Sequence, residues 1–148
     1  MCHYHQVYVD REWQLLERVP DRCGSRRVLR TVTARFGQTV RVPDAPGDID
    51  VARFDGVVTS LIDRLRTLVY AGRELYFRAG GVTRKPKAYR FLPGTQGSAH
   101  VLAMPECASR DLDGTGHAIQ TFALSDNRAA RATDDRYTVT FEAIRLRC

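Results

Sequence analysis

Two groups of side chains in the sequence could carry out chemistry. The first is the pair Asp111 and Asp113, because one carboxylate can attack a substrate while its neighbour handles the proton. The second consists of cysteine and histidine residues, the usual protein ligands of zinc: Cys2, His3, His5, Cys23, His100, Cys107 and His117. The chain lacks the CxxC or HxxxH spacing typical of zinc sites, although two of the histidines share a face of a predicted strand. We therefore predict no catalytic residue, cofactor or metal, and keep a metal at either group as an alternative.

The aspartate pair lies within a short string, Asp111-Leu112-Asp113-Gly114-Thr115. It resembles the first motif of the haloacid-dehalogenase phosphotransferases, where the resemblance implies a nucleophilic Asp, an acid/base Asp and Mg²⁺. In that family the motif ends a buried parallel strand, whereas here it follows Pro105 and a polar stretch. The same residues fit the start of an EF-hand calcium loop, but Gln120 stands where a bidentate glutamate belongs. We predict an Asp-Gly turn here.

A second string, Lys87-Ala88-Tyr89-Arg90-Phe91-Leu92, combines basic and aromatic residues. Tyr89 and Phe91 would share one face of a strand. The string resembles the ribonucleoprotein-1 motif of RRM domains, in which alternate aromatic side chains stack on RNA bases. Ala88 and Arg90 depart from that family's pattern at its two small positions. A basic strand face that carries aromatic side chains remains suited to single-stranded nucleic acid in any topology.

Positive charge is concentrated in two blocks. The net charge is +6, and only two of the 23 basic residues are lysines, a bias that GC-rich codons explain, although arginine also binds phosphate bidentately. Residues 11–41 hold eight arginines against three acids, and residues 75–105 hold five basic residues and no acid. Residues 106–135 are acidic, with six acids against three arginines. This asymmetry favours an acidic or phosphate-rich partner.

We therefore predict a binding module and not an enzyme. The leading hypothesis is contact with nucleic acid, RNA or single strands, through the two basic blocks: Arg22, Arg26, Arg27, Arg30, Arg78, Arg84, Lys85, Lys87, Tyr89 and Arg90. The alternative is a protein interaction or assembly protein, such as a viral or phage component or a pathogen factor. That class would dock on an acidic protein surface, with the arginines as a rim around an apolar centre. A small enzyme or metal-binding domain is the third possibility.

Composition is that of a soluble globular protein. The 148 residues fit a single domain, 1–148, and 43% of them are hydrophobic. No apolar run approaches the roughly 20 residues that span a bilayer, and the first ten residues lack the layout of a secretory signal. We expect a cytoplasmic protein with reduced, scattered cysteines and no disulfide framework.

The elements that must position these residues are one helix and several short strands. Apolar residues recur at spacings of three and four between Val51 and Val69, which predicts an amphipathic helix over about 49–71. Alternating patterns or turn residues predict strands at 3–9, 28–36, 39–42, 74–78, 88–92, 98–104, 117–124 and 137–146, while 13–19 fits a helix or a strand. Gly37-Gln38 predicts a hairpin between 28–36 and 39–42. The expected fold is α+β, a mostly antiparallel sheet packed against one principal helix.

Overall fold

Strands make up most of the chain that the structure describes. The computed structural model describes residues 2–9, 13–57, 75–81, 87–105, 119–126 and 136–147. Within these residues there are ten strands, one 3₁₀ turn and no α-helix. The elements are β1 (Tyr4–Val9), β2 (Gln14–Arg18), β3 (Cys23–Arg35), β4 (Val40–Arg41), β5 (Asp48–Asp55), β6 (Leu75–Gly80), β7 (Lys87–Phe91), η1 (Pro93–Thr95), β8 (His100–Ala103), β9 (Thr121–Asp126) and β10 (Arg136–Leu146).

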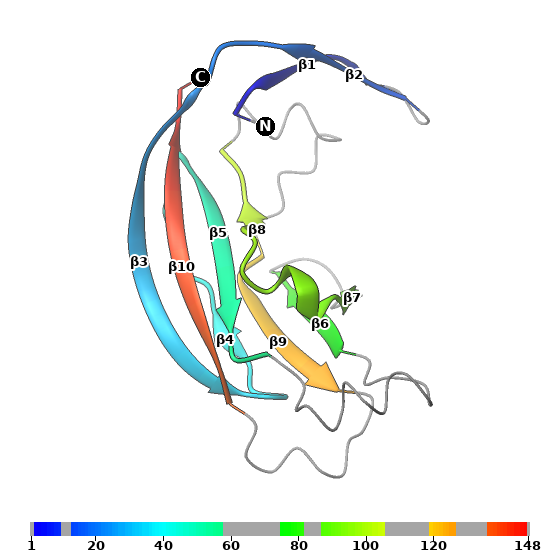
Figure 1. Cartoon of the computed structure of the whole chain (residues 1–148), viewed down its shortest axis with the longest axis vertical. Helices are drawn as coiled ribbons and strands as arrows, with labels where there is room; N and C mark the ends of the chain where they lie inside the picture. Colours follow the sequence, from blue (N-terminus) through cyan, green and yellow to red (C-terminus); the bar gives the residue numbers. More distant parts are fainter. Residues whose placement is uncertain are drawn as a thin grey trace.

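The strands form three antiparallel sheets (Figure 1). One four-stranded sheet has the order β3-β10-β5-β8, and the second has the order β4-β9-β6-β7. The third is a separate two-stranded ribbon of β1 and β2, which lies across the top of the molecule in Figure 1. The predicted antiparallel pairing is therefore confirmed.

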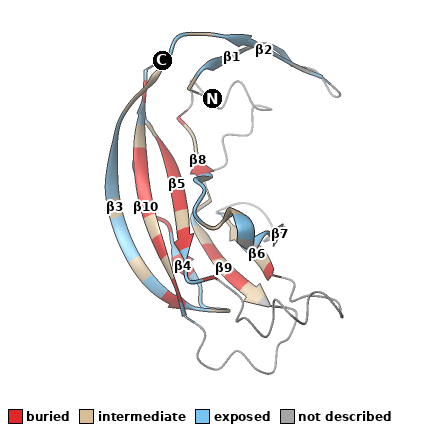
Figure 2. Ribbon diagram, viewed as in Figure 1, coloured by how far each residue is buried: buried red, intermediate tan, exposed pale blue. Residues whose placement is uncertain are grey.

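The core lies between the two four-stranded sheets, whose facing strands carry the buried residues shown in red in Figure 2. Phe54 of β5 is 2% exposed and sits at the centre of this core. Its ring contacts aromatic side chains from both sheets at centroid distances of 5.2–6.2 Å: Phe77, Phe91, His100, Phe122 and Tyr137. Edge-to-face contacts of this kind add to the free energy of burial. The architecture is a two-layer β-sandwich with a protruding ribbon.

The predicted α+β fold with a helix at 49–71 is wrong. Asp48–Asp55 is strand β5, which pairs with both β10 and β8. Val51 and Phe54 would share a face on a helix, whereas in β5 they point to opposite sides and are both buried. Phe54 faces the core between the sheets, whereas Val51 packs in a second buried cluster with Ile49 and Leu146. The remainder of the predicted helix, 58–71, lies outside the described residues.

Most predicted strands are confirmed, with one pairing error. The segment 13–19, left between helix and strand, contains β2, and the 74–78 and 88–92 strands form the antiparallel pair β6–β7. The turn at Gly37 exists, but β4 pairs with β9 of the opposite sheet and not with β3. The predicted hairpin is thus a crossing from one sheet to the other.

The cysteine prediction also needs correction. Cys2 and Cys23 form a disulfide between the ribbon and β3, so the expected reduced thiols are not what the structure contains at these two positions. Cys107 and Cys148 lie outside the described residues, as does the Asp111–Asp113 string. As for membranes, none of the described helical segments has the length and apolar character of a membrane span.

Candidate functional site

The β1–β2 ribbon, which we call the arm, carries an unusual concentration of exposed apolar side chains. Ten large hydrophobic residues are classed as exposed in the described chain, and six of them lie between residues 4 and 16. Their exposed fractions are 46% for Tyr4, 49% for Val7, 56% for Tyr8, 73% for Trp13, 60% for Leu15 and 47% for Leu16. Contiguous apolar patches on soluble proteins commonly mark interaction surfaces.

Apolar side chains occupy both faces of the arm. Tyr8 lies directly opposite Leu15 in the antiparallel register, so their side chains share a face. Tyr4 lies opposite Arg18, two residues from Leu16, which places Tyr4 and Leu16 on the other face. A register shift between Gln6 and Tyr8 separates these two pairs, because a β-bulge changes the side on which later residues project. Large apolar side chains on both faces of the arm therefore keep about half or more of their surface exposed.

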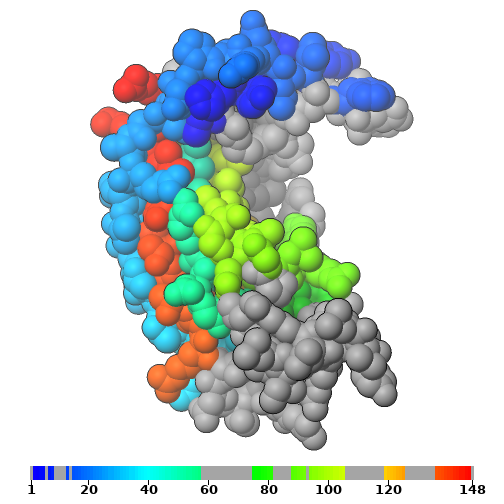
Figure 3. All heavy atoms as spheres, in the orientation of Figure 1, coloured from blue at the N-terminus to red at the C-terminus, as the bar shows by residue number. Residues whose placement is uncertain are grey.

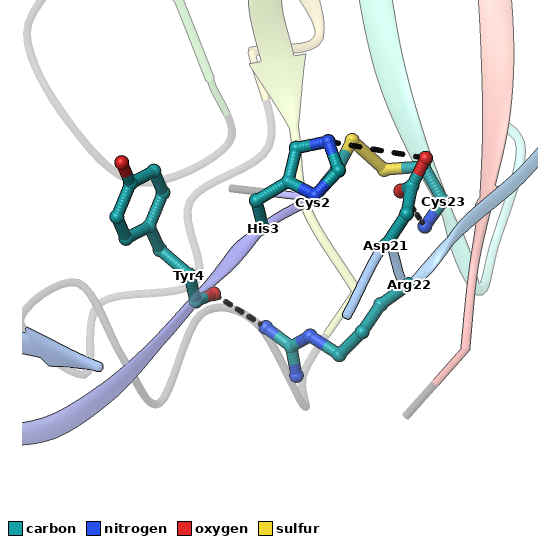
Figure 4. Close-up of a disulfide and its surroundings, with 6 residues drawn as sticks. All are labelled: Cys2, His3, Tyr4, Asp21, Arg22 and Cys23. Atoms are coloured by element: carbon teal, nitrogen blue, oxygen red, sulfur yellow. Dashed lines mark hydrogen bonds and ion pairs between the residues drawn. A yellow bond between two sulfur atoms is a disulfide. The ribbon is translucent and has the colours of Figure 1, made fainter. Parts of the chain in front are cut away.

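The base of the arm is fixed to the sandwich by several bonds (Figure 4). The Cys2–Cys23 disulfide joins the start of β1 to the start of β3. The backbone N–H of Arg22 donates to the carbonyl of Cys2 at 2.9 Å, and its guanidinium donates to the carbonyl of Tyr4 at 2.8 Å. Arg147 donates its backbone N–H to the carbonyl of Arg22, also at 2.9 Å. Arg22 is thus a structural residue at the arm's base, half-buried and with its guanidinium bonded to Tyr4.

Arg26, Arg27 and Arg30, the other site residues predicted in the first block, lie on β3, the edge strand of its sheet, and two of them are paired within the chain. Arg26 lies 3.4 Å from the Glu142 carboxylate, which Arg53 also contacts at 3.2 Å. Arg27 pairs with Asp48 at 3.1 Å. Arg30 is exposed. These side chains line one long edge that begins at the base of the arm.

The second block is only partly described. Arg84 and Lys85 lie outside the described residues, and Lys87 is placed at the start of β7. Arg78 and Arg90 are exposed on β6 and β7. Tyr89 and Phe91 share a face as predicted, since they lie opposite Phe77 and Leu75. Phe91, however, is buried in the core, and only Tyr89, 53% exposed, presents its ring to solvent.

A pocket of about 390 Å³ opens beside Tyr89, between the edge strands β7 and β8. Its walls are mainly aromatic and aliphatic: Phe77, Tyr89, Arg90, Phe91, Leu92, Thr95, His100, Val101, Leu102 and Ile119. His100 Nε2 lies 2.9 Å from the carbonyl of Thr95, so this nitrogen donates and the ring is held in place. In Figure 3 the yellow-green atoms of η1 and β8 lie beside the green atoms of β6 and β7.

No family model, curated protein or solved structure matches the chain. Function must therefore be inferred from these surfaces alone.

The two basic blocks, which we predicted to form one nucleic-acid interface, lie apart in the structure. β3 and β8 are the opposite edges of a four-stranded sheet, so three strand spacings, roughly 14 Å, lie between them. The pocket and Tyr89 lie at the β8 edge, away from Arg26, Arg27 and Arg30. The exposed residues of the arm were not predicted as a site. The unassigned 13–19 segment, with Trp13, Leu15 and Leu16 close together, was the signal available in the sequence.

Proposed function

We propose that the chain is a non-enzymatic interaction module that docks onto another protein through the β1–β2 arm. The observation that carries the proposal is the exposure of six large apolar side chains, five on the two faces of the arm and Trp13 immediately before β2. Aromatic side chains such as Tyr8 and Trp13 are enriched at the centres of protein interfaces. The arm therefore provides the apolar centre of an interface.

The partner's chemistry follows from the charges around this centre. Arg18 is exposed on the arm itself, and the arginine-bearing edge of β3 begins at the arm's base. Cys23–Arg35 includes four arginines and no acid. The partner surface is thus an apolar groove flanked by acidic residues, because complementary charge at the rim speeds and orients association.

Site-specific photocrosslinking in the source cell tests this proposal. A photoreactive amino acid replaces Trp13, Leu15 or, as control, Leu92, which is 56% exposed but lies at the pocket. Positions 13 and 15 should give a discrete adduct, and Leu15→Asp should remove the adduct at position 13. An adduct of twice the chain mass would identify the partner as a second copy. Absence of any adduct at both arm positions contradicts the proposal.

Single-stranded nucleic acid at the pocket is a second candidate function, and Tyr89 is the observation that favours it. Its ring is exposed at the mouth of an aromatic pocket, with Arg78 and Arg90 on the same two strands and no acid within residues 75–105. Base stacking on the ring would carry this binding. Arg78 and Arg90 alternate with Tyr89 in the β6–β7 register and project from the opposite face, so they would add long-range attraction for phosphate. Tyr89, Arg78 and Arg90 all belong to the second basic block, so this candidate function does not involve the first block.

Fluorescence anisotropy with labelled single-stranded RNA, single-stranded DNA and duplex tests the second candidate at about 50 and 200 mM salt. Tyr89→Ala should weaken binding by about 1–3 kcal/mol, the usual contribution of one stacked base, while Tyr89→Phe should bind normally. Tyr8→Ala is the matched control, since Tyr8 is 56% exposed on the arm. Affinity that is insensitive to Tyr89→Ala would exclude the pocket.

We propose the cytoplasm as the compartment, which is the location expected in the sequence analysis. The Cys2–Cys23 disulfide weighs against this location, because disulfides persist mainly in oxidising compartments. In the cytoplasm the same pair would be two thiols. Alkylation of the protein in intact cells, followed by mass spectrometry, distinguishes the two states.

A further inference from the structure

The base of the arm gathers four side chains that commonly bind zinc. The Sγ atoms of Cys2 and Cys23 and a carboxylate oxygen of Asp21 all lie within 4.8 Å of one another. His3 Nε2 lies 4.0 Å from Asp21 Oδ2. Figure 4 shows the His3 ring, the Asp21 carboxylate and the two sulfur atoms grouped together, while Arg22 points away toward Tyr4. We propose that the reduced form of the protein binds one Zn²⁺ through Cys2, His3, Asp21 and Cys23.

The number and types of ligand suit zinc. Structural zinc sites are tetrahedral and use thiolate, imidazole and carboxylate ligands at about 2.0–2.3 Å from the metal. In a tetrahedron of this size two thiolates lie about 3.8 Å apart. The two sulfur atoms and the Asp21 carboxylate, which lie within 4.8 Å of one another, therefore need only small movements to close around the ion, and His3 would join them from its position 4.0 Å from Asp21. Once the disulfide is reduced, rotation of the two cysteine side chains is enough to bring the sulfur atoms to the separation that the tetrahedron requires.

Backbone bonds hold the ligands in place independently of the disulfide. Cys2 and His3 lie on one segment and Asp21 and Cys23 on the other, and the backbone bonds Arg22 N–H to Cys2 O and Val19 N–H to His3 O join the segments at 2.9 Å each. Cys23 also packs against the buried cluster of Ile49, Val51 and Leu146. The four side chains therefore remain neighbours after reduction.

Asp21 is oriented for a metal. Its Oδ1 accepts a hydrogen bond from the backbone N–H of Cys23 at 2.9 Å, which fixes the carboxylate and leaves Oδ2 facing His3. Such a bond from an outer group is what commonly orients a metal-binding carboxylate. Cys2 and Cys23 are partly exposed and Asp21 is exposed, so both a reductant and the ion can reach the site.

A dithiol reductant supplies the electrons and protons needed to convert the disulfide into the zinc-binding form. The dithiol gives up two electrons and two protons and becomes a disulfide, while the Cys2–Cys23 bond breaks to yield two thiols. Zn²⁺ then replaces both thiol protons, which pass to solvent, so the site carries two thiolates, one carboxylate and a neutral imidazole. This leaves one net negative charge on the site. The arm is consequently fastened by a covalent bond when oxidised and by the metal when reduced.

Cobalt and zinc titration of the full chain tests the proposal. The protein is reduced with a water-soluble phosphine, and Co²⁺ is added, since tetrahedral thiolate-bound cobalt absorbs in the visible and near ultraviolet. We expect one Co²⁺ per reduced chain, displacement of that Co²⁺ by Zn²⁺, and no spectrum from the oxidised chain. A reduced chain without the cobalt spectrum overturns the proposal.

Variants assign the ligands. Cys2→Ser and Cys23→Ser should each abolish the thiolate bands, whereas the double variant Cys107→Ser/Cys148→Ser, which leaves the site intact, should retain them. Asp21→Asn keeps the disulfide available for folding and should weaken zinc binding by about 10-fold or more, because losing even an outer partner commonly costs about 10–100-fold. His3→Ala should lower affinity similarly. A spectrum that is unchanged in Cys2→Ser, an affinity that is unchanged in Asp21→Asn, or a spectrum that disappears in the Cys107/Cys148 variant places the metal elsewhere and overturns the proposal.

Discussion

At the scale of single residues, Asp50 is the group whose charge the fold controls most strongly. It lies on the central strand β5 and is 5% exposed, and its Oδ1 has no hydrogen-bond partner among the described atoms. The pKa of Asp50 is raised to about 6, mainly by burial and also by the nearby Asp44 and Asp48, against the lowering effects of a backbone hydrogen bond from Ala45 and the charge of Arg27. The carboxyl is thus destabilised when ionised at neutral pH.

This pKa predicts a pH dependence of stability. The pKa in the unfolded chain is near 3.8, so between about pH 4 and pH 6 the unfolded chain releases a proton that the folded protein retains. The free energy of unfolding therefore falls as pH rises through this window, by about 3 kcal/mol at most, and this group causes no further change above pH 6. Asn at position 50 resembles the protonated carboxyl, so Asp50→Asn should remove the decline and stabilise the protein at pH 7.

Urea denaturation at about pH 4.5, 5.5 and 7 measures this effect. The exposed Asp55, at the end of the same strand, provides the control, because Asp55→Asn should leave the decline unchanged. A pH profile that is the same in Asp50→Asn and the parent protein would contradict the assignment to Asp50.

At the scale of elements, the connection from β3 to β4 determines how the two sheets join. Gly37 has φ +82°, a left-handed conformation that glycine adopts without strain. Its N–H donates to Leu124 of β9 at 2.6 Å, and the Gln38 N–H donates to the carbonyl of Arg35 at 3.0 Å. The turn therefore directs the chain into the sheet that contains β9. As a result β4 pairs with β9 and not with β3, although β4 follows β3 directly in the sequence.

Gly37→Ala should lower the free energy of unfolding by about 1 kcal/mol, because an L-residue is strained in the left-handed region. Gly94→Ala is the matched control. A Cβ at either position meets no atom within 4 Å, but only Gly37 has a positive φ. Chemical denaturation should place Gly94→Ala within about 0.5 kcal/mol of the parent. Equal effects of the two substitutions would exclude backbone strain as the cause.

The positions of the strands could be predicted from the sequence better than which strands pair with one another. β10 and β3 were recognised because each has one face toward the core, so apolar residues alternate along them. β5 was mistaken for a helix because residues 49–52 are all buried, so the strand lacks an alternating apolar pattern. Without that alternation, the spacing of three between Val51 and Phe54 fits a helix as well as a strand. Pairing between distant segments, such as β4 with β9, leaves no local pattern.

The candidate site was harder to predict for the same physical reason. Cys2 and Cys23 are 21 residues apart and become neighbours only when β1 and β2 pair, so their spacing indicates neither a disulfide nor a metal site. Arg22 and Phe91 had suitable side chains for a ligand, but tertiary contacts occupy the first and bury the second. Tyr89 lies on a strand with its ring 53% exposed, and its predicted role in ligand binding stays a prediction.

At the scale of the whole molecule, the protein consists of a sandwich with one aromatic core and an arm attached through its base. Within the described residues the arm strands pair only with each other, and a two-stranded ribbon alone is at best marginally stable in water. The links at Cys2, Arg22 and Cys23 therefore keep the arm in place. The arm and the sandwich should consequently unfold with different free energies.

Phe54→Ala provides the means to observe this independence. Removing the ring at the centre of the core should lower the free energy of global unfolding by about 3–5 kcal/mol, because contacts to both sheets are lost together. Phe36→Ala, at a half-buried ring that lies 5.3 Å from Tyr137, should cost less. Native-state hydrogen exchange, read at individual amides, should show reduced protection along β10 and β5 in Phe54→Ala. Amides of β1 and β2 should keep their protection, since they exchange through local opening of the arm, which does not involve the core. If the arm amides lose as much protection as those of β10, the arm is part of the sandwich's cooperative unit and is not an independently attached surface.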